Sequence, residues 1–259
     1  MTEIYVELGG KKAIAWSLEW PGWCRIRTSE AAAVQALIET EARYLLIAQR
    51  AGLRFAPGDL VVVERLPGDA NTAWGVPSVL ASAETRPIDA VTAQRNVALL
   101  WAAWDMLEEV VMAAPPELRK GPRGGGRDTD GIWRHVIEAE QAYARKIGVR
   151  HKPFEANDKS ALKAMREEIA AALSKPSSGE PLVAGGWNAS YAARRMACGR
   201  SPLGDRRSSK LIAAVCKGVP GAGVFSQKRA APRYDRQRSP GRRRPRHLDQ
   251  GAPLPGPGG

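Results

Sequence analysis

The stretch NVALLWAAWDMLEEVV, residues 96–111, carries the clearest structural signal in this chain of 259 residues. Its large apolar residues recur every three or four positions, which is the period of a helix with one buried face. Pro115-Pro116 predicts the end of this helix, because proline cannot continue it. We therefore expect a long amphipathic helix that packs against others. Its apolar stripe comprises Val97, Leu100, Trp101, Trp104, Leu107 and Val111.

Three more helices are predicted downstream. Capping residues at 129–130, at 157–158 and at Asn188 each precede a stretch with helical apolar spacing. Four helices with moderate connections indicate an antiparallel bundle over residues 84–197. The apolar positions are Trp133, Val136, Tyr143 and Ile147 in the second helix, and Leu162, Met165, Ile169 and Leu173 in the third.

A small α+β module is predicted at residues 1–83. Ile4, Val6 and Leu8 alternate with other residues, which is typical of a half-buried strand, and Gly9-Gly10 predicts a hairpin turn. The partner strand should run over 13–20. A single helix should follow from Glu30 to near Gly52, capped by Thr28 or Ser29, and a further strand should cover 60–63.

The composition changes at Cys198. Residues 198–259 contain 14 Lys and Arg against three acidic residues, whereas the rest of the chain has 25 basic and 24 acidic residues. All eight tryptophans precede the change. A segment rich in Pro, Gly and Arg buries too little apolar surface to fold, so we expect 198–259 to be a disordered basic tail.

Two residues of the second helix could carry chemistry. His135 borders the apolar stripe, and Glu140 falls within it beside Trp133 and Tyr143. A buried carboxylate needs a partner, which could be an arginine, a hydroxyl group or a metal ion. His135 and Glu140 lie about 140° apart around a helix with 100° per residue, so they cannot both face one ion. The residues alone leave open a structural pair and a ligand set.

The helical part resembles the DinB-like family of four-helix bundles, which includes thiol-dependent S-transferases and mycothiol-dependent maleylpyruvate isomerases. The resemblance is carried by the Trp-rich first helix, by His135…Glu140…Tyr143, and by Asn188…Tyr191…Arg194-Arg195-Met196-Ala197. It implies a divalent metal, zinc or nickel, and a low-molecular-weight thiol bound to it as the thiolate. It also implies three ligands, namely a histidine of the second helix and an HxxxH pair of the fourth.

His135 matches the first of these ligands, but no HxxxH follows Ala197. A catalytic metal usually has three protein ligands and a water, so the resemblance implies a thiol-transferase-like protein without a complete metal site. Whether this chain is an enzyme stays open.

The missing pair has a possible genetic origin. Residues 197–207 can be back-translated so that a one-base shift reads His-Val-Ala-Asp-His-Pro-Trp-Glu-Ile-Glu-Asp, which contains an HxxxH. A frameshift and a natural basic tail are therefore the two explanations of 198–259.

The N-terminal module resembles the HicB-like antitoxin fold. The resemblance rests on the first strand, on Trp20-Pro21-Gly22-Trp23-Cys24, and on Thr28-Ser29-Glu30-Ala31 leading into a helix. It implies an alternative function, an antitoxin or regulatory protein whose basic tail contacts nucleic acid without sequence preference. A plain β-β-α module that packs or forms a homodimer through its sheet edge is the other interpretation.

Several protein classes are disfavoured. Residues 1–7 lack the basic and apolar segments of a signal peptide, and no run approaches 18 apolar residues. The three cysteines, Cys24, Cys198 and Cys216, share no close spacing, so neither a disulfide framework nor a CxxC metal site is expected. We therefore expect a cytoplasmic protein with no membrane contact.

Overall fold

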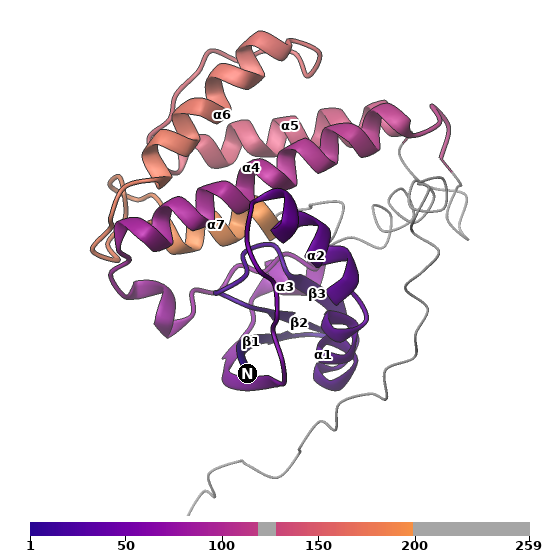
Figure 1. Ribbon diagram of the computed structural model, residues 1–259, viewed down its shortest axis with the longest axis vertical. Helices are drawn as coiled ribbons and strands as arrows, with labels where there is room; N and C mark the ends of the chain where they lie inside the picture. The colour runs from indigo at the N-terminus through magenta and orange to yellow at the C-terminus, as the bar shows by residue number, and fades with distance from the viewer. Residues whose placement is uncertain (119–127, 199–259) are drawn as a thin grey trace, which may run out of the picture. The chain divides into compact units, whose positions relative to one another are not determined.

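The computed structural model describes residues 1–118 and 128–198 (Figure 1). The fold is mixed α and β, as the sequence predicts. The residues at 120–128, KGPRGGGRD, predict a loop rich in Gly and Arg, and all of it except Asp128 lies outside the described residues. The predicted tail after Cys198 lies outside them as well. No helix within the described ranges is long and apolar enough to cross a membrane.

Four strands form one sheet in the order β3-β2-β1-β4. β1 (Thr2–Gly9) and β2 (Lys12–Trp16) form the predicted hairpin, with Gly10 at φ 57° in its turn. β3 (Cys24–Arg27) is antiparallel to β2, while β4 (Leu60–Pro67) is parallel to β1 and forms an edge of the sheet.

Three predicted boundaries in this module are wrong, the first being the end of the strand expected over 60–63, which continues to Pro67. The strand expected over 13–20 ends at Trp16, because the chain turns back there and Ser17 N–H donates to Trp23 O at 3.2 Å. β3 then begins at Cys24, a strand that the sequence analysis missed. The single helix expected from Glu30 is divided into α1 (Glu30–Ile38) and α2 (Glu41–Arg50), with Thr40 between them.

Local hydrogen bonds explain where α1 begins and ends. Ser29, one of the two predicted caps, accepts a bond from Ala32 N–H. The Thr40 hydroxyl donates to both Ala36 O and Leu37 O at 2.9 Å, so it occupies carbonyls at the end of the helix. Such side-chain to backbone bonds compete with continued helix.

β1 is covered on both sides, which corrects the half-buried strand that its alternation predicts. Ile4 and Val6 face a core shared with α1 and α2. Tyr5 and Glu7, on the opposite face, are also buried, at 4% and 0% exposure. Tyr5 stacks on Trp16, and both belong to a cluster that includes Leu66, Ala81 and Cys198. This opposite face of β1 is covered by the connector, which we define as residues 68–89 between β4 and the long helices, and by the end of the last helix.

The connector contains a short helix, α3 (Ala70–Trp74), and a 3-10 helix, η1 (Ser82–Thr85). Four longer helices follow, as predicted. Asp128 caps the second of them, one residue before the predicted caps at 129–130, whereas Asp158 and Asn188 cap the third and fourth as expected. The helices are α4 (Ala90–Ala113), α5 (Thr129–Arg145), α6 (Lys159–Leu173) and α7 (Ala189–Cys198).

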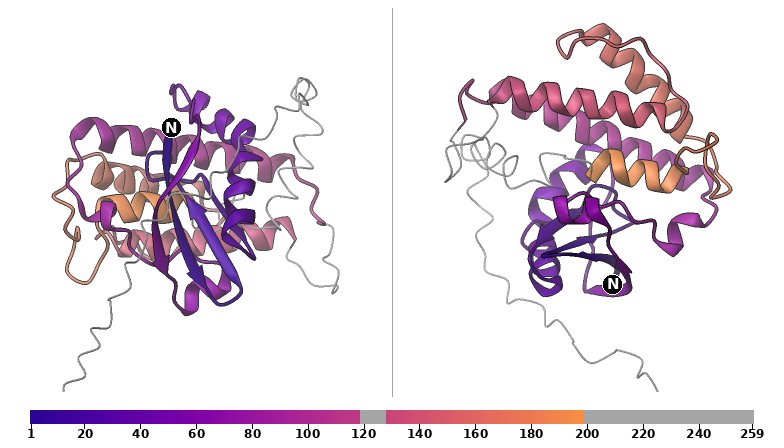
Figure 2. Two further views of the ribbon diagram at one scale, coloured as in Figure 1. Left: turned by 90° about the horizontal axis from the view of Figure 1, so that it is seen from below. Right: turned by 180° about the vertical axis from the view of Figure 1, so that it is seen from behind.

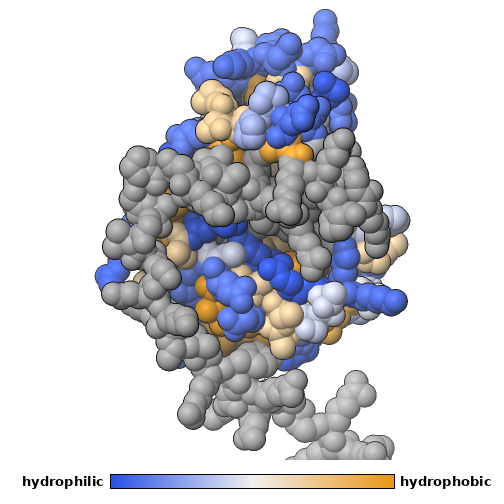
Figure 3. Space-filling view, turned by 90° about the vertical axis from the view of Figure 1, so that its right-hand side faces the viewer, coloured by the Kyte–Doolittle hydropathy of each residue, from blue (hydrophilic) through white to orange (hydrophobic). Residues whose placement is uncertain are grey.

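α4 belongs to both cores of the molecule. Its Leu99 and Ala102 pack with the sheet module, whereas Leu100 and Trp104 pack with α5, α6 and α7. Figures 1 and 2 show α4 and α7 side by side, between the sheet on one side and α5 and α6 on the other. Hydrophobic residues are also exposed in small groups, as Figure 3 shows for one face.

Candidate functional site

A pocket lies between α4, α5 and α7. Eight of its ten lining residues are apolar, and the two polar ones are Glu140 and Tyr143 from α5. The stripes that the sequence predicts on the first two long helices supply five of these ten residues. The apolar lining is Leu100, Ala103, Trp104, Leu107, Val136, Ala139, Met196 and Ala197.

Glu140 has the partner that its buried position requires, and that partner is an arginine. Arg166 of α6 donates to the two carboxylate oxygens of Glu140 from Nε at 2.9 Å and from Nη2 at 3.1 Å. Arg166 also donates to Glu108 and lies over the Trp104 ring, 4.9 Å from its centroid. Burial raises the pKa of Glu140, although the charge and hydrogen bonds of Arg166 and a bond from Trp104 oppose this.

His135 is half-buried and stands four residues before Ala139, which lines the pocket. Residues four apart on a helix share a face, so His135 lies one turn from the pocket toward the start of α5. α7 runs antiparallel to α5, because Tyr143 packs on Trp187 just before α7 begins, while Val136 lines the pocket together with Met196 near the end of α7. The end of α7 is thus directed toward the turn that carries His135.

The described residues do not fit the metal site that the family resemblance implies. No group of three or more His, Cys, Asp or Glu side chains that could hold a metal ion occurs in residues 1–118 and 128–198. Glu140 is the acidic residue of the pocket lining, and its carboxylate is already bound by Arg166. We therefore assign no chemical step to a metal.

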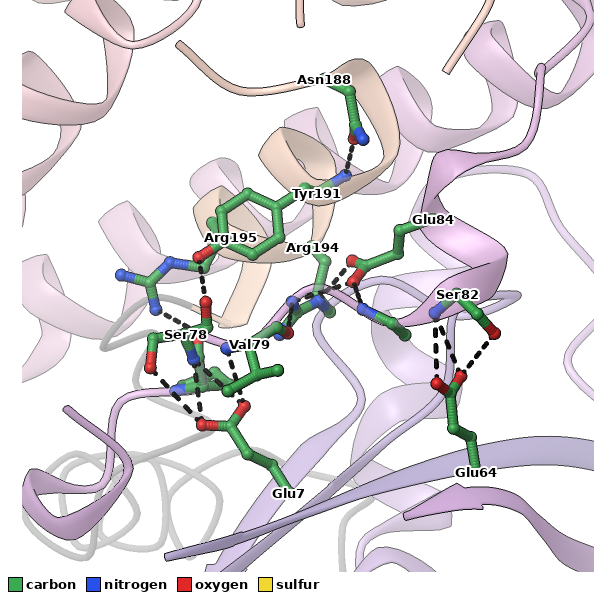
Figure 4. Close-up of polar contacts among 12 residues, drawn as sticks. Glu7, Glu64, Ser78, Val79, Ser82, Glu84, Asn188, Tyr191, Arg194 and Arg195 are labelled. Atoms are coloured by element: carbon green, nitrogen blue, oxygen red, sulfur yellow. Dashed lines mark hydrogen bonds and ion pairs between the residues drawn. The ribbon is translucent and has the colours of Figure 1, made fainter. Parts of the chain in front are cut away.

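A second polar cluster joins α7 to the connector and was missed by the sequence analysis (Figure 4). Arg194 donates to Glu84 of η1 from Nε at 2.6 Å and from Nη2 at 3.1 Å, and both side chains are at most 1% exposed. Arg194 also donates to Val79 O at 3.0 Å and lies over the Trp16 ring. Burial lowers the pKa of Arg194, but Glu84 outweighs it, so the pKa is raised.

The same cluster reaches the sheet through Glu7. The backbone N–H groups of Ser78 and Val79 donate to its carboxylate at 3.1 to 3.2 Å, and the Thr72 hydroxyl donates as well. On the other side, Tyr191 donates to Ser78 O at 2.9 Å and Arg195 to Pro77 O at 2.8 Å. The connector is therefore held from below by β1 and from above by α7, as Figure 4 shows.

One sequence signal could have revealed this cluster. Arg194-Arg195 is a pair of adjacent cations in a short helix that is otherwise apolar from Tyr191 to Ala197. Neighbouring helix positions differ by about 100°, so both arginines share one side of the helix, and if that side is buried they need an acidic partner. The partner itself, 110 residues earlier in the chain, is not predictable from spacing.

Comparisons of this chain with protein-family models, with curated proteins and with solved structures found no match.

Proposed function

We propose that this chain is a DinB-like bundle protein of the thiol-transferase type, which binds its ligand in the pocket between α4, α5 and α7 and lacks a complete metal site in its described residues. The observation that carries the proposal is the pocket itself. Its apolar wall and its two polar groups lie on the bundle helices that carry the family resemblance, and His135 lies one turn away on α5.

The lining defines the ligand class. Eight apolar side chains select a ligand with an apolar body, because they offer it removal from water and no hydrogen bond. Glu140 and Tyr143 stand on one wall and can orient a polar group of the ligand. An S-alkyl conjugate of a low-molecular-weight thiol combines these features. Because the enclosed space is only about 20 Å³, the end of the alkyl chain would enter it and the peptide-like part would stay outside.

The test is calorimetric titration of the full chain with S-hexylglutathione. We expect saturable binding, which Ala139→Leu should weaken by at least tenfold, because the larger side chain fills the pocket. Ala142→Leu is the matched control, since this residue is also half-buried on α5 but does not line the pocket. Equal binding by both variants, or none by the unmodified chain, contradicts the proposal.

The alternative function is a HicB-like regulator that contacts nucleic acid. It depends on the 14 Lys and Arg residues of the tail, all of which lie after Cys198 and therefore outside the described residues. A module that forms a homodimer through its sheet edge is a third and separate alternative. We rank both below the first proposal, because the pocket is an observation on the described part of the chain.

A further inference from the structure

Two cysteine thiols that are 174 positions apart in the sequence meet where the sheet contacts the end of α7. Cys24 begins β3, and Cys198 is the last described residue of α7. Both belong to one hydrophobic cluster, with exposed fractions of 1% and 4%. Each thiol affects the pKa of the other, and both cysteines are free thiols.

The backbone on each side holds the two sulfurs together. Gly22, at φ +93°, packs so closely on Ala197 that a Cβ atom at Gly22 would lie 3.2 Å from the Ala197 Cβ. Two hydrogen bonds hold the backbone turn that contains Gly22. Tyr44 donates to Pro21 O at 2.8 Å, and the Trp23 indole donates to Leu37 O at 3.1 Å. Contact between the sulfurs therefore does not depend on flexible side chains alone.

The surroundings of the two sulfurs are not equivalent. Burial raises the pKa of Cys198, but the bond from Cys24, the charges of Arg194 and Arg195 and a bond from the Gly22 N–H outweigh it and lower the pKa. The bond to Cys198 and burial both raise the pKa of Cys24. Cys198 is thus the better thiolate and the first to react with a peroxide, whereas Cys24 keeps its proton until it acts as the resolving thiol and must give it up as its sulfur attacks.

We propose that Cys24 and Cys198 form a reversible disulfide when the protein meets a peroxide. The Cys198 thiolate attacks one oxygen of hydrogen peroxide and breaks the O–O bond, which gives a sulfenic acid and, after protonation, one water. The Cys24 sulfur then attacks the sulfenic sulfur, and the departing hydroxide takes the Cys24 proton as the second water. The two thiols lose two electrons in total, and the peroxide gains them.

The bond would tie β3 covalently to the helix that lines the pocket. Met196 and Ala197, immediately before Cys198, form part of the pocket wall. A disulfide here closes a loop of most of the described chain, so it should stabilise the protein chiefly by restricting the unfolded chain. It would also hold the last turn of α7 against the sheet.

The experiment uses the full chain with Cys216→Ser, which leaves only the two thiols in question. The folded protein is treated with hydrogen peroxide, unfolded in the presence of an alkylating reagent, digested and examined by mass spectrometry. We expect loss of both alkylatable thiols, a linked peptide pair containing Cys24 and Cys198, a raised Tm, and reversal of all three by dithiothreitol.

Cys24→Ser and Cys198→Ser, each in the Cys216→Ser background, are the controls. Each should leave one thiol that gives no internal link. The proposal is overturned if the treated parent, still folded by circular dichroism, keeps both thiols alkylatable. It is equally overturned if one cysteine is oxidised to the sulfinic acid without a linked peptide, or if the link forms only between two copies of the chain.

Discussion

Replacing Glu84 with Gln removes one negative charge from the ion pair with Arg194 and keeps the size of the side chain. Glu84 accepts two hydrogen bonds from Arg194 and one from Ala81 N–H, at 2.6 to 3.1 Å. The variant leaves the guanidinium group of Arg194 buried, with its charge uncompensated, between the rings of Trp16 and Tyr191.

The expected cost follows from this burial. Removing one partner of a fully buried ion pair destabilises a protein by about 3–5 kcal/mol, because the remaining charge has neither water nor a counter-ion. For a domain of this size, about 1 kcal/mol corresponds to roughly 2–4 °C in Tm. We therefore expect Glu84→Gln to melt on the order of 10 °C lower than the parent.

The assay is a double-mutant cycle with Glu84→Gln, Arg194→Met and the double variant, each followed by denaturant unfolding. Because the double variant has no unpaired buried charge, its loss in unfolding free energy should be smaller than the sum of the two single losses. Glu30→Gln is the matched control. It breaks the Arg65–Glu30 pair, whose side chains are 47% and 21% exposed, and it should cost only about 0–1 kcal/mol.

Two results would refute this reasoning. The ion pair does not hold α7 to the connector if Glu84→Gln unfolds within about 1 kcal/mol of the parent, which is the range for exposed pairs. Strict additivity in the cycle would show that the two side chains do not interact in the folded protein.

Three further predictions concern the bundle. The pKa of Glu140 in the folded protein is raised above the ordinary 4.5. The folded state therefore holds this proton more tightly than the unfolded chain does. The contribution of Glu140 to the free energy of unfolding should fall as the pH rises from about 4.5 through the raised pKa. Melts of the parent against Glu140→Gln check this, and a pH-independent difference contradicts it. The chain as printed should retain no stoichiometric zinc or nickel after dialysis; metal that is lost in His135→Ala would reveal ligands that we have missed. A one-base correction near codon 197 should restore an HxxxH and raise the Tm when zinc or nickel is added; an unchanged melt counts against both the frameshift and the DinB-like site. That correction also removes Cys198, so the thiol pair is tested in the chain as printed.

The four long helices were the part of the fold that could be predicted from the sequence. The spacing of Trp101, Trp104 and Leu107 gives the helical period directly, and Pro115 marks where the helix cannot continue. Each helix also begins next to a capping side chain, so the starts of α5, α6 and α7 were placed to within a residue or so. These signals are local, and they need no knowledge of neighbouring elements.

The sheet module was predicted less well because its deciding contacts are distant in sequence. Alternation in β1 suggested one buried face, but the connector and α7 bury Tyr5 and Glu7 on the other face. The break between α1 and α2 depends on two hydrogen bonds from Thr40, which could equally have stood inside a continuous helix. Tertiary contacts decided both outcomes.

For the candidate site, the sequence predicted that Glu140 would be buried and would need a partner, and it named an arginine as one option. It could not identify Arg166 as that arginine, since the pair spans α5 and α6. Cys24 and Cys198 show the same limit more strongly, because wide spacing argued against any relation between them. Metal binding at His135 stays a prediction.

The most direct test of the proposed function is a titration of the isotopically labelled full chain with S-hexylglutathione, followed through the indole N–H signals of its tryptophans. Trp104 lines the pocket, whereas Trp74 is 82% exposed on α3. Our account predicts a saturable shift of the Trp104 signal while the Trp74 signal stays in place. No shift of Trp104 up to the solubility limit of the ligand, or equal shifts of both signals, would contradict it.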